Sequence, residues 1–135
     1  MFVDASAICA ILLQEPDGKE LILRLGETSD RLTSPMSVWE SVIVLANRGA
    51  LSVRDAHGMV TDLLALAEIK LVAVPPETAA LAVEAFERYG KGRHPAALNF
   101  GDCFSYACAR HFRVPLLYKG DDFGRTDIAT AAIGD

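Results

Sequence analysis

Short apolar runs alternate along the chain with longer amphipathic segments, a pattern typical of strands and helices that follow one another. Strands are predicted at the apolar runs 1–5, 31–35, 70–74 and 114–118, with a short last one at 128–133. Helices are predicted where apolar residues recur every three or four positions, at 6–14, 18–27, 37–49, 52–68, 77–90 and 101–112. Residues 91–100 are predicted to form a loop.

Strands that alternate with helices favour a mostly parallel sheet with helices on both faces. We therefore expect an α/β protein, a three-layer α/β/α domain with a mostly parallel central sheet. The 135 residues contain no repeat and no long linker, so residues 1–135 are predicted to form a single domain. In open sheets of this kind, ligands bind at the carboxyl ends of the strands.

The composition is that of a globular protein, with 51% hydrophobic residues. No apolar run approaches the roughly 18–20 residues that a membrane span needs. The chain opens into a predicted strand without a basic segment, so no signal peptide is expected. The three cysteines lie in apolar runs and are expected to be buried side chains. Together these features predict a cytoplasmic protein.

Acidic residues stand alone in three apolar segments. Asp4 is the only charged residue in 1–14, Glu40 in 35–47 and Asp102 in 95–109, while Asp121 and Asp122 closely follow an apolar strand. An ionised carboxylate in apolar surroundings costs several kcal/mol unless it is compensated. Because the first three have no Lys or Arg in their own segments, the compensation must come from hydrogen bonds, a distant basic residue or a bound cation.

All of these acids except Glu40 also have an ordinary structural explanation. Asp4 could cap the following helix, Asp102 could complement a helix dipole, and the KGDDFG segment is rich in turn formers. Glu40, in the middle of a helix, gains nothing from a cap. A cluster of such carboxylates at one sheet edge suits Mg²⁺ or Mn²⁺, and these cations support phosphodiester hydrolysis.

The net charge of −5 argues against a protein that coats nucleic acid. It is compatible with a nuclease, because a local basic rim can serve one site. Lys91 and Arg93, beside His94, form the densest basic cluster, and Lys119 lies near the second acidic motif. Lys91, Arg93 and Lys119 are therefore candidate contacts to RNA phosphates.

Four segments resemble the PIN domain family, and specifically the VapC-type ribonuclease toxins of bacterial toxin–antitoxin pairs. They are FVDASAICAIL, SPMSVWESVIVL, YGKGRHPAALNFGDCFSYACA and LLYKGDDFGRTDI. The resemblance implies a PIN-like fold and a metal-dependent endoribonuclease that acts on structured RNA such as tRNA. It also implies a VapB-type antitoxin that covers the site, and a homodimer.

The resemblance further implies which residues serve the site. Asp4, Glu40 and Asp102 would be the metal ligands for Mg²⁺ or Mn²⁺, with Asp122 as the fourth acid. Asp121 stands where close relatives often carry Asn, so either residue of the pair could reach the metal.

Several neighbouring residues keep two interpretations. Ser6 either hydrogen-bonds Asp4 or caps its helix, and Asn99 either orients the site or closes the loop before Asp102. Thr126 and Asp127 are expected to hold the KGDDFG loop. His94, like His57 and His111, is expected to have no catalytic role.

Other protein classes fit the sequence less well. A non-catalytic PIN-fold interaction module is the main alternative, but such proteins usually lose a carboxylate and here the acidic set is complete. A receiver-like domain needs a phosphoacceptor aspartate at the end of a middle strand, which 70–74 lacks. A haloacid dehalogenase-like phosphotransferase needs Asp-x-Asp at the first strand, where this chain has Asp4, Ala5 and Ser6.

Overall fold

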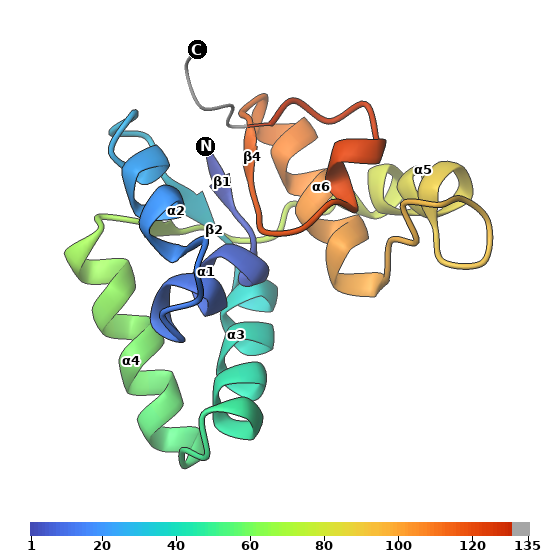
Figure 1. The fold of residues 1–135 in the computed structure, drawn as a ribbon. Helices are drawn as coiled ribbons and strands as arrows, with labels where there is room; N and C mark the ends of the chain where they lie inside the picture. Colours follow the sequence, from blue (N-terminus) through green and yellow to red (C-terminus); the bar gives the residue numbers. More distant parts are fainter. Residues whose placement is uncertain (131–135) are drawn as a thin grey trace.

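The computed structural model describes residues 1–130, and its centre is a fully parallel sheet of four strands in the order β3-β2-β1-β4 (Figure 1). Phe2 in the central strand pairs with Leu32 on one side and Leu116 on the other. The predicted parallel sheet is confirmed, although each strand is only two residues long. The strands are β1 (Phe2–Val3), β2 (Leu32–Thr33), β3 (Lys70–Leu71) and β4 (Leu116–Leu117).

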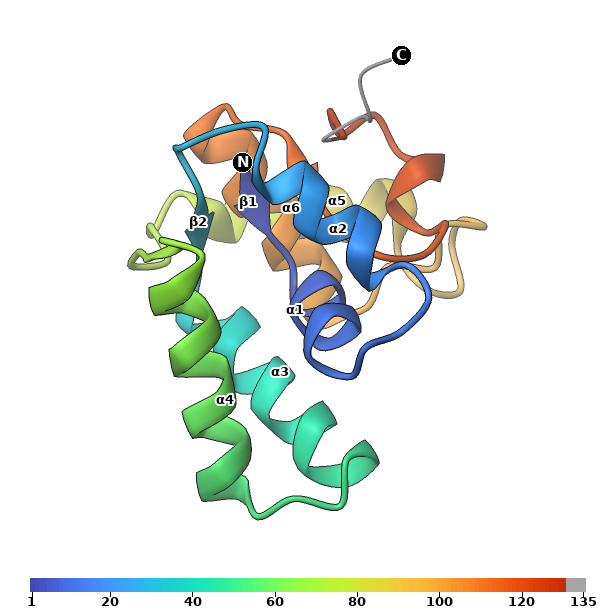
Figure 2. The ribbon, with the colours of Figure 1, turned by 60° about the vertical axis from the view of Figure 1, so that its left-hand side comes forward.

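Six α-helices and one 3₁₀ helix surround the sheet within residues 1–130. In Figures 1 and 2, α5 and α6 lie on one side of the sheet, while α3 and α4 form a hairpin that extends from the other side. None of the described helices is both long and apolar enough to span a membrane. The helices are α1 (Ala5–Leu12), α2 (Gly18–Leu25), α3 (Pro35–Arg48), α4 (Val53–Leu66), α5 (Thr78–Tyr89), α6 (Phe100–Phe112) and η1 (Phe123–Arg125).

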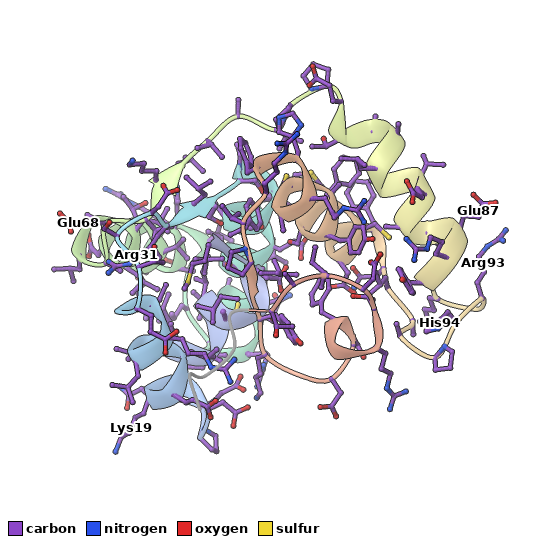
Figure 3. The ribbon with its side chains drawn as sticks, turned by 90° about the horizontal axis from the view of Figure 1, so that it is seen from above. Lys19, Arg31, Glu68, Glu87, Arg93 and His94 are labelled. Atoms are coloured by element: carbon purple, nitrogen blue, oxygen red, sulfur yellow. The ribbon has the colours of Figure 1, made fainter. Side chains whose placement is uncertain are left out.

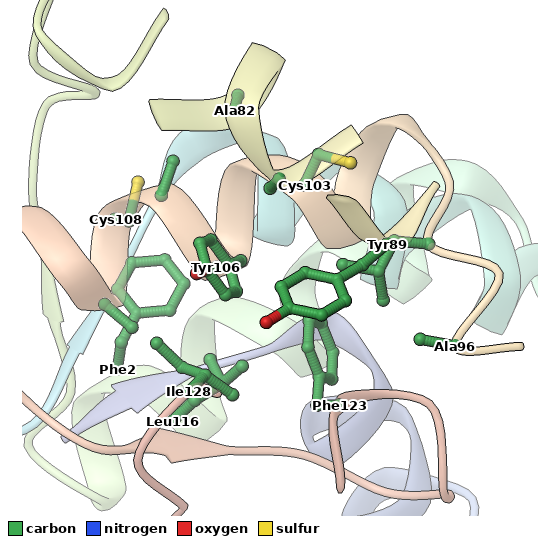
Figure 4. Packing of buried hydrophobic residues seen from close by; sticks show 14 of the residues in the cluster. Phe2, Ala82, Tyr89, Ala96, Cys103, Tyr106, Cys108, Leu116, Phe123 and Ile128 are labelled. Carbon is green, nitrogen blue, oxygen red and sulfur yellow. The ribbon is translucent and has the colours of Figure 1, made fainter. Parts of the chain in front are cut away.

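Two hydrophobic cores lie between the layers, one on each face of the sheet. Because side chains alternate along β1 and β4, neighbouring residues of each strand face different cores. Phe2 and Leu116 are buried with residues of α5 and α6 (Figure 4). Val3 and Leu117 are buried with residues of α1 to α4. The expected three-layer α/β/α arrangement is therefore confirmed. All three cysteines are buried and unpaired, as expected.

The segment after η1 is tied to the α5–α6 layer through Asp127. Its carboxylate accepts hydrogen bonds from the Tyr106 hydroxyl at 2.6 Å and from Arg88 at 3.2 Å. Burial alone would raise the pKa of Asp127, but these hydrogen bonds and the charges of Arg88 and Arg110 lower it below its usual range. The structure thus gives Asp127 the structural role expected from the sequence.

Some predicted boundaries differ from those of the structure. The first helix begins at Ala5 rather than Ser6, because the Asp4 side chain is the cap that accepts the Ser6 N–H. The same helix ends at Leu12, and Gln14 adopts a positive φ of 53°. Thr130 forms a parallel bridge to Leu116, which agrees with the predicted last strand, but residues 131–133 of that strand lie outside the described residues.

Candidate functional site

Three of the predicted carboxylates line one cavity of about 290 Å³. Asp4 comes from the end of β1, Glu40 from α3, and Asp102 from the first turn of α6. These residues are far apart in the sequence, and the parallel topology brings them to the carboxyl end of β1, where binding sites of open sheets lie. The remaining lining residues are Ala5, Ser6, Cys9, Glu15, Val44, Arg48, Asn99 and Lys119.

Asp4 is almost fully buried and is held by two serines. Its Oδ2 accepts the Ser6 hydroxyl at 2.6 Å and the Ser6 N–H at 2.9 Å. Its Oδ1 accepts the Ser105 hydroxyl at 2.5 Å. One carboxylate therefore caps α1 and also lines the cavity. Ser6 orients this carboxylate and is not itself the cap.

Glu40 reaches the cavity because residue 101 is a glycine. A Cβ at Gly101 would overlap the carboxylate of Glu40, so the side chain lies directly against the backbone of α6. Glu40 makes no structural cap in the middle of α3. This close approach places the Glu40 carboxylate against the first turn of α6, which also carries Asp102.

Asp102 is oriented by a capping box at the start of α6. The Asn99 side chain accepts the Asp102 N–H at 2.9 Å, and the Asp102 Oδ2 accepts the Asn99 N–H at 3.0 Å. Asn99 thus closes the loop and orients the acidic side chain at the same time. The other carboxylate oxygen of Asp102 is not used by this capping box.

The neighbouring acids Asp121 and Asp122 face different surroundings. The charge of Asp122 contributes to raising the pKa of Asp102, so Asp122 lies within electrostatic range of the cavity. Asp121 lines a separate cavity with Arg24, Tyr118 and Lys119. Neither residue lines the acidic cavity, and of the two only Asp122 acts electrostatically on Asp102.

Burial and mutual repulsion raise the pKa values of two of the lining acids. For Glu40, desolvation by burial is the main cause, followed by the charges of Asp4 and Asp102, and the pKa rises to about 7. For Asp102, burial raises the pKa to about 6, helped by the charges of Asp4 and Asp122 and opposed by the hydrogen bond from the Asn99 backbone. A cation near these acids would relieve the repulsion.

These pKa values predict that the metal-free protein loses stability as the pH rises from about 4 to about 7. A carboxyl whose folded pKa lies above its unfolded value binds more protons in the folded state, so its favourable contribution is lost as pH rises through the folded pKa. In EDTA, the free energy of unfolding by urea should be roughly 1–3 kcal/mol lower at pH 7.5 than at pH 5. Glu40→Gln should flatten this dependence. Stability that rises over this range would contradict the repulsion.

The donor set fits a hard cation chemically, although the carboxylates do not surround one point. Within residues 1–130, no three Asp, Glu, His or Cys side chains are grouped closely enough to hold a metal ion as they stand. Asp4 and Asp102 are instead held by the hydroxyl and backbone donors described above. Cys9 also lines the cavity, but burial raises the pKa of its thiol to about 11, so it stays protonated at neutral pH. The ionisable oxygen donors are of the kind that Mg²⁺ and Mn²⁺ prefer.

The predicted basic residues are not gathered around the cavity. Of the three, Lys119 lines it, and its ammonium pairs with Glu15. The Arg93 guanidinium lies over the Phe86 ring, 5.3 Å from its centre. Figure 3 shows Arg93 and His94 at an outer edge of the molecule. His94 accepts the Ala96 N–H through Nδ1 at 3.0 Å, which agrees with a structural role.

Sequence reasoning missed four residues of this site. Ser105 lies three positions after Asp102, and that helical spacing places both on one face, so the sequence did carry a signal. Gly101 matters only because Glu40 packs against it, which no local pattern reveals. Glu15 looks like part of a turn and Arg48 like an ordinary basic residue at the end of a helix.

Comparison with known proteins identifies the family. The PIN domain family model matches residues 1–129. The chain is 42% identical over 134 residues to Ribonuclease VapC30 of Mycobacterium tuberculosis, covering 98% of this chain and 99% of that protein. The chain belongs to the PIN domain family. Within this family it groups with the VapC proteins, since it is also 44% identical to Ribonuclease VapC of Mycolicibacterium smegmatis, covering 96% and 98% of the two chains.

The fold of a solved PIN-family protein agrees with this assignment. The crystal structure of Mycobacterium tuberculosis VapC20, described as a Sarcin-Ricin loop cleaving toxin, superposes with a TM-score of 0.74 over 95% of each chain. The sequence identity of that pair is 17%, so this comparison supports the PIN fold alone.

Proposed function

We propose that this protein is a metal-dependent endoribonuclease that acts as the toxin of a toxin–antitoxin pair. The observation that carries the proposal is the meeting of Asp4, Glu40 and Asp102 in one cavity at the carboxyl end of the parallel sheet. The VapC relatives, named as ribonucleases and similar over nearly the whole chain, support RNA as the substrate.

The cavity residues would have different roles in the reaction. Asp4, Asp102 and Glu40 would hold Mg²⁺ or Mn²⁺, with Asp122 close by. When bound, the cation supplies positive charge that favours ionisation of water and offsets the charge developing on the phosphate. Ser6 and Ser105 orient Asp4, and the Asn99 capping box orients Asp102. Glu40 would be the third oxygen donor, and its carboxylate is placed by its close approach to Gly101 of α6.

The substrate and partners follow from the same assignment. Structured RNA, with tRNA as the first candidate, would place one phosphate at the cavity and others near Lys91, Arg93 and Lys119. A VapB-type antitoxin would neutralise the enzyme by covering the cavity, and both would meet in the cytoplasm.

Cleavage assays with purified protein test the proposal. Incubation with tRNA and with other structured RNAs should give defined fragments in Mg²⁺ or Mn²⁺ and none in excess EDTA, with activity restored by added metal. Adding the product of a neighbouring antitoxin gene should suppress cleavage. A protein that binds a partner but cuts no RNA in either metal would instead be a non-catalytic interaction module.

The proposal includes a homodimer, supported by an apolar face beside the acidic cavity. Two cavities, of about 640 and 490 Å³, share Phe100 and are lined largely by apolar residues of α3, α5 and α6. Trp39, Val83 and Phe100 on this face are each more than 60% exposed in the single chain. Large exposed apolar patches commonly mark protein contacts.

A charge placed on this face should separate the dimer. Val83→Glu, on the exposed side of α5, is expected to give a monomer by light scattering, because burying an unpaired carboxylate costs several kcal/mol. Leu66→Glu is the matched control, since Leu66 is 85% exposed and lies on α4, away from this face. A Val83→Glu protein that remains dimeric would place the interface elsewhere.

A further inference from the structure

An ionic bridge of three side chains lies at the acidic cavity. Glu15 Oε1 lies 3.2 Å from the Arg48 guanidinium, and Oε2 pairs with the Lys119 ammonium. All three residues line the cavity. The Glu15 side chain is only 12% exposed, whereas those of Arg48 and Lys119 are 61% and 35% exposed. The acid is thus the buried centre of the bridge and the cations face the solvent.

The backbone fixes the position of Glu15. Gln14 adopts a φ of 53°, in the left-handed region that residues other than glycine rarely occupy. This turn returns the Glu15 N–H to the Ala10 carbonyl at 2.9 Å, and the Glu15 carbonyl accepts the Gly18 N–H at 2.9 Å. The end of α1 is therefore turned so that Glu15 faces the cavity.

Lys119 is fixed from a second direction. Its backbone N–H donates to the Ser6 hydroxyl at 3.0 Å, and that hydroxyl donates to Asp4. Lys119 is thus linked both to Asp4, through Ser6, and to Glu15 of the bridge. Its ammonium and the Arg48 guanidinium keep donors that Glu15 does not use, because Lys offers three and Arg five.

The nearby carboxylates explain why Arg48 and Lys119 need a fixed partner. Flexible Lys and Arg side chains next to Asp4, Glu40 and Asp102 would be attracted to those carboxylates and would compete with a metal ion for them. Glu15 offers another partner, and the bridge as a whole keeps one net positive charge. That charge and the unused donors lie where an RNA phosphate would approach.

We propose that Glu15 is a positioning residue that holds Arg48 and Lys119 as a pair of phosphate-binding cations beside the acidic cavity. Arg48 is thereby added to the RNA-contacting residues. The proposal rests on the proposed ribonuclease function. It differs from a simple effect of charge, since removing an acidic residue near an anionic substrate would by itself tighten RNA binding.

The test compares Glu15→Gln, Arg48→Ala and Lys119→Ala. At saturating RNA, Glu15→Gln should lower the single-turnover cleavage rate at least about 10-fold, because misplacing a positioned substrate is costly. RNA binding is measured in an Asp102→Asn background so that the substrate survives. There, Arg48→Ala and Lys119→Ala should each lower the slope of log K against log salt by roughly 0.7–0.9, while Glu15→Gln should leave it unchanged. Glu84→Gln is the matched control, since Glu84 pairs with Arg88 on exposed α5 and should cleave normally.

The possible outcomes separate the two proposals. A wild-type rate for a folded Glu15→Gln, or unchanged salt slopes for both alanine variants, overturns the role of the bridge while leaving the ribonuclease intact. If Glu15→Gln lowers the thermal midpoint strongly, the two alanine variants, which keep Glu15, decide through their slopes. A wild-type protein that cuts no RNA in Mg²⁺ or Mn²⁺ refutes the proposed function, and the salt slopes then still test the phosphate contacts.

Discussion

Asp102→Asn is expected to lower the rate of RNA cleavage by more than about 100-fold while the protein stays folded. Mutations of residues that merely support metal ligands typically cost 10–100-fold, and loss of a ligand charge should cost more. The amide oxygen of asparagine can still accept the Asn99 N–H, so the capping box at α6 survives. Repulsion with Asp4 and Asp122 is removed.

Stability is the control for this variant. Because the pKa of Asp102 is raised in the folded protein, removing its charge at pH 7.5 without metal should leave the thermal midpoint unchanged or raise it, by an amount equivalent to about 1 kcal/mol. Differential scanning calorimetry in EDTA measures this. A large fall in the midpoint would show that Asp102 is chiefly structural. Asp4→Asn is a less clean test, because Asp4 also caps α1 and accepts both serine hydroxyls.

Gly101→Ala is expected to reduce cleavage at least about 10-fold without destabilising the protein. The added methyl group would overlap the Glu40 carboxylate, which is the far end of a flexible side chain and can move away. Alanine is a better helix former than glycine, so α6 itself should not suffer. The variant therefore moves the Glu40 carboxylate without replacing any acidic residue. Single-turnover cleavage measures the loss and calorimetry measures the stability.

Gly58→Ala provides the matched control in another helix. A Cβ at Gly58 meets nothing within 4 Å, so this change should leave cleavage unaltered and raise stability by roughly 0.5–1 kcal/mol. Full activity of Gly101→Ala would mean that the position of the Glu40 carboxylate against α6 has no part in the reaction.

Hydrophobic periodicity predicted the layers and the parallel sheet because the apolar positions of each element must face one of the two cores. It predicted the lengths of the strands and helices less well. The run 70–74 reads as a strand, yet only Lys70–Leu71 pairs in the sheet. The predicted end of the first helix was also wrong. The residue with the left-handed backbone conformation is Gln14, and without a glycine there the sequence gives no signal of the turn.

The carboxylates of the site were predictable because each is conspicuous in an apolar segment. What they contact was not predictable, since those contacts join segments that are distant in the sequence. Ser105 bonds Asp4 across 101 positions, and Lys119 bonds Glu15 across 104. The choice between Asp121 and Asp122 likewise depends on how the loop after β4 is turned, which side-chain chemistry alone does not set.

Binding of Mn²⁺ to the acidic cavity is the most direct test of the central claim. Electron paramagnetic resonance of free Mn²⁺, titrated with the wild-type protein and with Asp102→Asn, measures the affinity at the site while cleavage of the same RNA is followed in parallel. The proposed function predicts that the wild type binds Mn²⁺, that Asp102→Asn binds it at least about 10-fold more weakly, and that cleavage by the wild type tracks the bound fraction. Equal Mn²⁺ affinity in the two proteins, or full cleavage by the wild type in excess EDTA, would contradict it.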